Sequence, residues 1–598
     1  MRIHRSIPTL LFLSLCLGFA ACSKKTEQQY PHLQFIPADT TYAIVSLEPA
    51  PDEVIKKFEQ AYAELGEAYF NLIKNSMQKT GDFDQNKIDE LLDKNPWLDA
   101  LAKEFMQDGE ISLNAIRNFG VDSGSTYALY GHGVLPVLRM RLSDPKLFNA
   151  AIARIETNAK DKLPSIQVKG ENVWEVAAKE FKVHFVTQAN DLVVSVSPAN
   201  LDKKFLPDLL GFNLPESSLA SAKTFASLMD EKDYLPVSLG FIDFERILDR
   251  FIEPMRGVDM GFATAMGKDN SKNLNLSASC KSELRGIVKA APRLVFGATE
   301  YDAKNMNIET LLEMDPALAT KMTGLTSAVP GLGELNGLFS MGFSFNLKAM
   351  REFGLERIAH FENNPYQCEF LQIPDTVLVK SKQALSNPAT GMLEGIRGFN
   401  VVIDEVDQSL VDKVIELEAS GASKSEKDQL IMSGIGGHAV IAVDDTENLY
   451  NMGKMFSPEL AQLDLKPDGK PKVINDISPQ ALPIEVQAAM TDTAYIFSFG
   501  KNAEKKSALV QGLESEPHSP LISYAVDMDA YIGLINKVFD SPKAQEEMLK
   551  DDEFSELSDL EDMQKILESI YNLFDSMIVN FRFRDDGIVI EQNIKMKK

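Results

Sequence analysis

The sequence predicts an α+β fold in two tandem domains, each an antiparallel or mixed sheet with packed helices. Short alternating strands recur, polar turns join them, and amphipathic helices interleave without a regular βαβα rhythm. Blocks of the first half also recur, in the same order, in the second half. We therefore expect an internal duplication, with the first domain over 35–320 and the second over 325–598.

The duplication rests on matching blocks of sequence. "SPANLDKK" at 197–204 matches "FGKNAEKK" at 499–506 at an offset of 302 residues, and the same offset aligns Leu147-Phe148 with Leu449-Tyr450. A later block, "LGFIDFERILDRF", matches "SYAVDMDAYIGLI" at an offset of 284. The alternative is chance, because strand-then-helix units look alike in many α+β proteins. Five such blocks, including these three, occur in the same order in both halves, and this favours duplication.

Turn residues and periodicity predict the individual elements. Two segments read as paired strands around polar turns, at 189–191 and at 491–493, and Asp586-Gly587 is a type I′ hairpin signal. Helices are expected over 52–79, where apolar residues recur at helical spacing, and over 543–575, which has an acidic outer face.

Four aspartates follow predicted strands where a helix should begin: Asp144, Asp243, Asp445 and Asp527. Carboxylates in such positions could be catalytic. However, an aspartate at a helix N-cap accepts hydrogen bonds from free backbone N–H groups, and the repeated strand–Asp–helix pattern favours this capping role.

Composition excludes some classes of protein. A chain of 598 residues with 44% hydrophobic content is long and apolar enough for more than one folded core. The formal net charge is −26, and removal of residues 1–21, which carry two arginines and no acidic residue, takes it to −28. Such a surface repels phosphates, so we expect no nucleic-acid partner.

Residues 1–21 have the outline of a secretory signal peptide. Arg2 and Arg5 precede an apolar run from Ile7 to Ala21, which is too short to span a bilayer comfortably and ends in small residues. We therefore expect export, followed by removal of this segment.

The end of that segment, Phe19-Ala20-Ala21-Cys22, resembles the lipobox of bacterial lipoproteins, in which the cysteine is acylated after cleavage. The resemblance implies a lipid anchor on Cys22, a tether over 22–34 and a membrane partner reached through acyl chains. Ser23, in place of aspartate, implies the outer membrane of the cell envelope by similarity to Gram-negative sorting. The alternative is an ordinary signal peptide in which Cys22 is incidental.

Two further cysteines remain in the exported chain. If Cys22 is acylated, Cys280 and Cys368 form the one remaining pair in an oxidising compartment. We predict a Cys280–Cys368 disulfide, the alternative being two separately buried thiols.

Three segments resemble motifs of known chemistry, but each lacks a residue or a spacing that the motif requires. "DFDQNKIDELLD" at 82–93 opens like a calcium loop but has Lys87 where glycine is needed. "SGIGGH" at 433–438 misses the dinucleotide spacing, and "SMQKTG" at 76–81 lacks the other motifs of penicillin-recognising enzymes. We predict no catalytic, metal or cofactor-binding residue, although a triad of distant residues stays open because triads are defined by geometry.

Two methionine- and glycine-rich connections, 254–267 and 325–343, would suit an adaptable apolar binding surface, but an ordinary irregular core is the favoured interpretation. The start of the mature chain, "FIPADTTYAIVSLEPAP" at 35–51, resembles a group of secreted bacterial domains of unknown function, through Pro37-Ala38-Asp39-Thr40 and Tyr42. This resemblance implies no catalytic residue.

Three hypotheses for function follow. The first is a lipid-anchored, non-enzymatic binding or scaffold protein of the cell envelope, with a protein partner. The second is a carrier or chaperone for a hydrophobic ligand. The third is a hydrolase with a site assembled from distant residues, which would require a cleft with convergent titratable groups.

Overall fold

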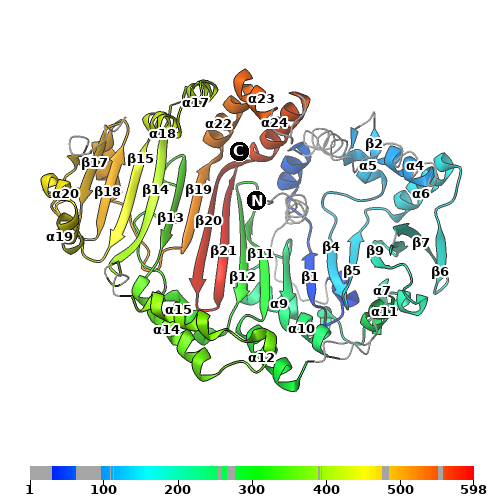
Figure 1. Cartoon of the computed structure of the whole chain (residues 1–598). Helices are drawn as coiled ribbons and strands as arrows, with labels where there is room; N and C mark the ends of the chain where they lie inside the picture. Colours follow the sequence, from blue (N-terminus) through cyan, green and yellow to red (C-terminus); the bar gives the residue numbers. More distant parts are fainter. Residues whose placement is uncertain are drawn as a thin grey trace. The chain divides into compact units, whose positions relative to one another are not determined.

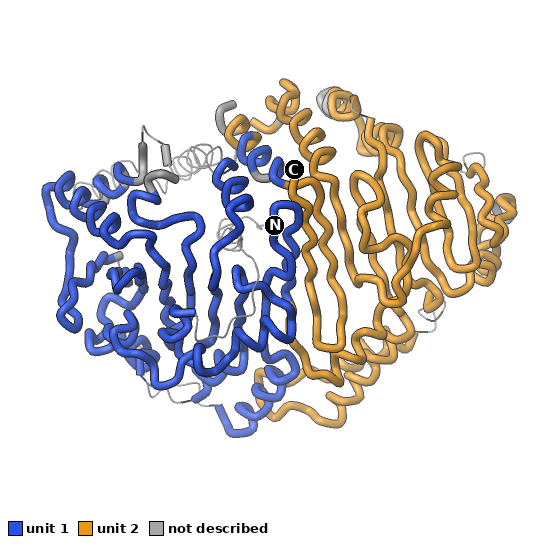
Figure 2. The backbone as a smooth tube through the Cα atoms, turned by 180° about the vertical axis from the view of Figure 1, so that it is seen from behind, with its two compact units in different colours: residues 1–310, 565–573, 598 blue, residues 311–564, 574–597 orange. Residues whose placement is uncertain are grey.

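The computed structural model describes residues 30–61, 96–107, 110–111, 113–178, 180–253, 257–265, 276–387, 391, 393–407, 409–474, 484–549 and 557–598. The chain divides into two compact units (Figure 2). Unit 1 comprises residues 1–310, 565–573 and 598, and unit 2 comprises 311–564 and 574–597. The predicted signal peptide, Cys22 and the segments 76–81 and 82–93 lie outside the described residues.

Unit 1 is built on an antiparallel sheet. Its strands are β1 (Tyr42–Ser46), β4 (Tyr127–His132), β5 (Leu135–Arg141), β6 (Ser165–Val168), β7 (Glu171–Ala178), β8 (Phe181–Gln188), β9 (Asp191–Pro198), β10 (Leu239–Asp243) and β11 (Arg293–Tyr301). They lie in the order β6-β7-β8-β9-β5-β4-β1-β10-β11. The chain passes from unit 1 to unit 2 within β12 (Asn305–Glu313).

The helices of unit 1 interleave with these strands (Figure 1). They include η2 (Pro31–Phe35), α4 (Pro96–Phe105), α5 (Leu113–Asn118), α6 (Pro145–Ala159), η3 (Lys203–Phe205), α7 (Leu206–Leu209), α8 (Leu219–Ala222), α9 (Thr224–Lys232), α10 (Phe244–Ile252), α11 (Gly257–Ala265) and α12 (Ala278–Ala290). A short pair of strands, β2 (Met106–Gln107) and β3 (Glu110–Ile111), follows α4.

The strands of unit 2 also pair antiparallel. Its strands are β13 (Phe339–Ser344), β14 (Ile396–Val406), β15 (Ile435–Val443), β16 (Lys472–Val473), β17 (Val486–Met490), β18 (Ala494–Phe499), β19 (Ile522–Asp527), β20 (Phe574–Arg584) and β21 (Gly587–Met596). They lie in the order β16-β17-β18-β15-β14-β13-β19-β20-β21.

The helices of unit 2 include α13 (Pro316–Thr323), α14 (Leu347–Asn363), η5 (Glu369–Leu371), α15 (Asp375–Leu385), α17 (Leu410–Ala419), α18 (Lys424–Ser433), α19 (Thr446–Phe456), α20 (Pro458–Leu463), α21 (Ala503–Gln511), α22 (Met528–Asp540) and α23 (Pro542–Met548). Helix α24 (Leu557–Tyr571) is divided between the units, with residues 565–571 assigned to unit 1. Helices α14 and α15 lie at one end of strands β13 and β14, and α17 and α18 lie at the other end (Figure 1). The α+β class predicted from the sequence is thus confirmed.

The two sheets share one strand order. Strands β7, β8, β9, β5, β4, β1, β10 and β11 of unit 1 correspond in turn to β16, β17, β18, β15, β14, β13, β19 and β20 of unit 2. A common order is what a duplication would produce, although descent of both halves from one domain stays a prediction.

The structure corrects the alignment used to predict that duplication. The helix caps Asp144 and Asp445 stand 301 residues apart, so Phe148 corresponds to Leu449 and not to Tyr450. In the next hairpin, Leu192 pairs with Met140 of β5 and Tyr495 pairs with Ile441 of β15, which sets an offset of 303. A single offset of 302 fails because the connections between helix and hairpin differ in length.

All four predicted caps are present. The side chains of Asp144, Asp243, Asp445 and Asp527 accept hydrogen bonds from backbone N–H groups in the first turns of α6, α10, α19 and α22. Each aspartate satisfies a donor that the helix itself leaves free. These carboxylates therefore stabilise helix starts.

Two predicted elements differ in detail. The hairpin between β20 and β21 turns at 585–586, and Gly587 is already the first residue of β21. A Cβ atom there would lie 2.0 Å from the carbonyl oxygen of Leu312, so glycine permits a close backbone approach and not the turn. In place of one expected helix over 543–575, the described residues form two helices, α23 and α24. Helix α24 ends at Tyr571, before β20 begins at Phe574.

The predicted disulfide between Cys280, on α12, and Cys368, which precedes η5, is present. Packed structure also begins inside the predicted tether, because η2 is held against unit 1 by buried His32 and Leu33. Behind η2, the fully buried guanidinium of Arg139 lies 3.5 Å from the ring of Phe35.

Candidate functional site

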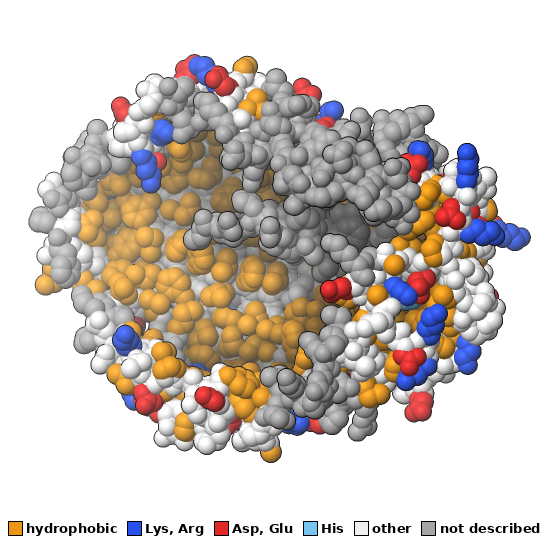
Figure 3. Space-filling model, turned by 45° about the vertical axis from the view of Figure 1, so that its right-hand side comes forward, with side chains coloured by type: hydrophobic (Ala, Val, Ile, Leu, Met, Phe, Trp, Pro, Cys, Tyr) orange, Lys and Arg blue, Asp and Glu red, His pale blue; other side chains and the backbone are white. Residues whose placement is uncertain are grey.

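One face of the unit 2 sheet carries its large apolar side chains outward. In β13, Ser340, Gly342 and Ser344 are buried, whereas Phe339 and Met341 are 39% and 40% exposed. This reverses the usual pattern, in which the large apolar residues of a strand point into the core. Figure 3 shows a hollowed face on which hydrophobic side chains gather.

The strand register extends this pattern to neighbouring strands, and we call the result the apolar face of unit 2. Its members share the side of the sheet that carries Phe339: Phe339, Met341, Phe343, Phe399, Val401, Ile403, Ile522, Tyr524, Val526, Met577, Val579 and Phe581. Large exposed patches of this kind mark binding surfaces in soluble proteins.

Unit 1 contains an apolar pocket of about 580 Å³. It lies between the β5, β7, β8 and β9 strands and the helices α4, α5 and α6. All fourteen residues that line it are hydrophobic: Trp97, Leu101, Ile116, Phe119, Val121, Met140, Phe148, Ile152, Ile155, Leu163, Val176, Phe185, Leu192 and Val194. We call it the unit 1 pocket.

Local sequence explains how α6 forms one wall of this pocket. Phe148, Ile152 and Ile155 recur at i, i+4 and i+7 and therefore share one side of the helix. The Phe148 ring makes edge-on contacts with Trp174 and Phe185, at centroid distances of 5.9 and 6.3 Å. Aromatic contacts of this geometry fix the wall in place.

Unit 2 contains a smaller apolar pocket of about 370 Å³, the unit 2 pocket. It lies between β18 and the helices α19 and α20. It is lined by Leu393, Leu449, Tyr450, Met452, Gly453, Leu460, Leu463, Leu465, Tyr495 and Phe497. Both tyrosine hydroxyls of this lining are hydrogen-bonded. Tyr450 OH donates to the carbonyl of Leu460 and accepts from the N–H of Leu465, and Tyr495 OH donates to the carbonyl of Thr446.

The two pockets occupy corresponding places in their units. Phe148 of α6 corresponds to Leu449 of α19 through the helix caps, and both side chains line a pocket. Leu192 and Val194 of β9 correspond to Tyr495 and Phe497 of β18 through the register, and all four line the pockets. The same helix and the same strand therefore enclose apolar space in both units.

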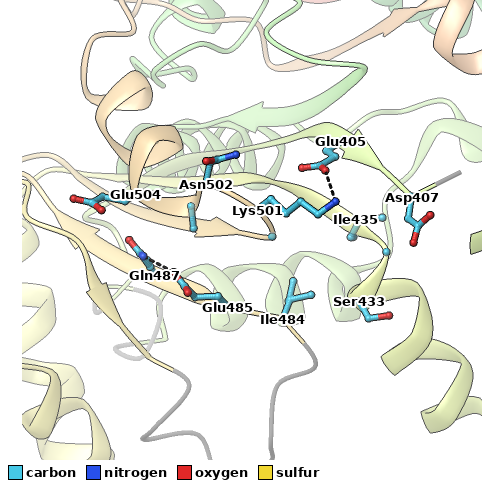
Figure 4. A pocket seen from close by; sticks show the side chains of 13 residues that line it. Glu405, Asp407, Ser433, Ile435, Ile484, Glu485, Gln487, Lys501, Asn502 and Glu504 are labelled. Atoms are coloured by element: carbon cyan, nitrogen blue, oxygen red, sulfur yellow. Dashed lines mark hydrogen bonds and ion pairs between the residues drawn. The ribbon is translucent and has the colours of Figure 1, made fainter.

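A polar pocket of about 450 Å³ lies at the start of α21 in unit 2 (Figure 4). Its lining includes the carboxylates of Glu405, Asp407, Glu485 and Glu504. Lys501 lies 3.4 Å from Glu405, and Gln487 donates from Nε2 to Glu485. An acidic lining of this kind identifies no ligand.

A buried polar group in unit 1 has the order of a catalytic triad. His184 Nε2 lies 2.9 Å from Ser197 Oγ, and His184 Nδ1 lies 3.6 Å from Glu175 Oε2. However, Ser197 is 1% exposed, so no substrate carbonyl reaches its hydroxyl. Burial also lowers the pKa of His184, which keeps the imidazole neutral. This group does not provide the site that a hydrolase needs.

Other kinds of site are not found among the residues that the structure describes. They contain no group of three or more histidine, cysteine or acidic side chains placed to hold a metal ion. No helix in the described ranges is both long and apolar enough to cross a membrane. A comparison of the chain with protein-family models and with curated proteins finds no match.

The sequence-derived candidates are only partly involved in these pockets. Cys280 and Cys368 pair with each other, and Cys22 lies outside the described residues. Of the methionine-rich connections, Met341 lies on the apolar face, whereas α11 packs against unit 1 through buried Val258 and Ala263. The pockets themselves were missed. Their only sequence signal was an alternating strand such as β9, in which Leu192 and Val194 share one apolar face, and this pattern is equally typical of an ordinary core strand.

Proposed function

We propose that this protein is a non-enzymatic binding protein of the cell envelope, anchored through Cys22, whose ligand is hydrophobic. The observation that supports it best is the unit 1 pocket, whose volume of about 580 Å³ falls in the usual range for ligand sites. Its wholly hydrophobic lining suits a hydrocarbon chain and excludes tight binding of a polar metabolite.

Energetics favour a binding role for this pocket over an incidental packing defect. An apolar pocket that is open to water leaves hydrophobic surface exposed, and this forgoes roughly 25 cal/mol for each Å² that burial would remove from water. A pure scaffold gains nothing from such a pocket. Its presence at corresponding places in both units therefore supports the carrier hypothesis over the scaffold hypothesis.

The proposed anchor would keep the pocket near a membrane. Seven residues separate Cys22 from Tyr30, which is buried in unit 1. Even fully extended, seven residues span at most about 25 Å. A hydrophobic ligand leaving a bilayer would thus have a short path to unit 1.

Binding of the neutral dye N-phenyl-1-naphthylamine to the Cys22→Ser protein tests the proposal. We expect saturable binding that 1-dodecanol displaces. The double variant Leu101→Trp/Ile116→Trp places two large rings in the unit 1 pocket and should lower the affinity of this pocket for the dye at least tenfold. Ile166→Trp on β6, outside both pockets, is the matched control and should bind normally.

The opposite result is equally clear. If the folded wild-type protein binds neither dye nor 1-dodecanol saturably, the carrier function is wrong. A protein partner sought by cross-linking in intact cells would then become the leading hypothesis.

A further inference from the structure

We propose that the unit 2 pocket binds the chain of an anionic amphiphile, such as a fatty acid, and that Lys454 binds its carboxylate. This inference deepens the proposed function, on which it rests, by assigning a second site and the charge of its ligand. It is carried by the position and the environment of one lysine that contacts a wall residue of the unit 2 pocket.

Lys454 lies on α19, the helix that supplies Leu449, Tyr450, Met452 and Gly453 to the pocket wall. Its ammonium stands 4.7 Å from the centre of the Tyr450 ring. Tyr450 itself lines the pocket and is only 6% exposed. Lys454 does not itself line the pocket, but its positive charge lies beside the ring of a residue that does.

No carboxylate of the described residues forms an ion pair with Lys454. The acid nearest in sequence to the lining leucines Leu463 and Leu465 is Asp464, and it pairs with Lys466 at 3.7 Å and Lys472 at 3.5 Å. Lys454 is a partly buried residue, and an ammonium beside an aromatic ring gains from an added anion through a charge-assisted hydrogen bond.

The corresponding place in unit 1 lacks this charge. The offset of 301 residues between the two helices matches Lys454 with Ala153 of α6. The unit 1 pocket therefore has apolar walls without a cation at that place, whereas the unit 2 pocket pairs apolar walls with a cation. We infer that the two sites differ in selectivity: unit 1 does not distinguish a fatty acid from its alcohol, and unit 2 prefers the acid.

Lys454 also has a purely structural explanation. It lies in the last turn of α19, where a positive charge interacts favourably with the negative end of the helix dipole. That explanation predicts an effect on stability but none on ligand choice. The test therefore compares two ligands that differ only in charge, dodecanoic acid and 1-dodecanol, at pH 8.

The experiment uses the full Cys22→Ser chain carrying Leu101→Trp/Ile116→Trp, so that the dye N-phenyl-1-naphthylamine reports on unit 2. We expect dodecanoic acid to displace the dye at lower concentration than 1-dodecanol does. Adding Lys454→Met should lower the affinity for dodecanoic acid about five- to tenfold, as expected for the loss of one charge-assisted hydrogen bond. The affinity for 1-dodecanol should change less than twofold. Lys146→Met, on exposed α6 surface, is the control.

Other outcomes overturn the inference. If Lys454→Met lowers the affinity for the acid and for the alcohol equally, or changes neither affinity, then Lys454 does not bind the carboxylate. A second variant, Leu449→Trp, should block both ligands, and unchanged binding of both would show that the unit 2 pocket is not their site. Dye binding that persists without acid selectivity defeats this inference alone, whereas absence of dye binding in every protein defeats the proposed function as well.

Discussion

Replacement of His32 by glutamine should flatten the pH dependence of unfolding on the acid side. His32 is 2% exposed in η2, and its Nε2 lies 3.0 Å from Thr126 Oγ1. Burial lowers the pKa of His32 from 6.5 to about 4; the neighbouring Asp191 opposes this effect, and Arg139 and Arg141 add to it. The folded protein therefore holds a neutral imidazole at pH values where the unfolded chain is protonated.

The sign and the size of the effect follow from this difference in pKa. Because the folded-state pKa lies below the unfolded one, the unfolded state binds the extra proton as the pH falls. The contribution of neutral His32 is fully present above pH 6.5 and is lost as the pH falls toward 4. Between pH 8 and pH 5 the loss amounts to about 2 kcal/mol of the free energy of unfolding.

Urea unfolding at pH 8 and pH 5 measures this loss. Three other histidines also have a lowered pKa: His132, His184 and His438. They are present in both proteins, so the test uses only the difference in pH dependence between wild type and His32→Gln. His518→Gln, which replaces an exposed histidine, is the matched control. An unchanged drop in the His32→Gln protein would refute the argument that burial of the neutral imidazole controls acid stability here.

Two further predictions concern stability. Replacing Cys280 and Cys368 by alanine should lower the free energy of unfolding by about 4–5 kcal/mol, because the unfolded chain regains the entropy of a long loop, and reductant should then have no further effect in urea unfolding. Asp243→Ala should cost about 1 kcal/mol through loss of the bond from the N–H of Arg246 at the start of α10, and Asp243→Asn, which keeps an acceptor oxygen, should recover most of it in thermal melts.

Much of the local structure could be predicted from the sequence because it depends on neighbours along the chain. Aspartate caps such as Asp144 act within one helical turn, and the turn between β8 and β9 joins strands adjacent in sequence. The pairing of Cys280 with Cys368 followed from counting thiols in an oxidising compartment, without knowledge of the fold.

The pockets could not be predicted in this way, because they depend on contacts between distant segments. Met140 and Leu192 face each other only because β5 pairs with β9, and Phe148 reaches them only because α6 packs over that pair. In the sequence, these residues are indistinguishable from ordinary core positions. Whether apolar side chains close on each other or leave space between them is decided by packing.

The sequence by itself determined the fold class, the helix starts and the cysteine pair, since propensity, capping and redox chemistry are properties of short segments or of composition. Only the tertiary structure decided that Phe339 and Met341 face outward, that apolar pockets lie at corresponding places in both units, and that Lys454 contacts Tyr450 in the wall of the unit 2 pocket. Register and packing set these positions, and both act between residues that are far apart along the chain.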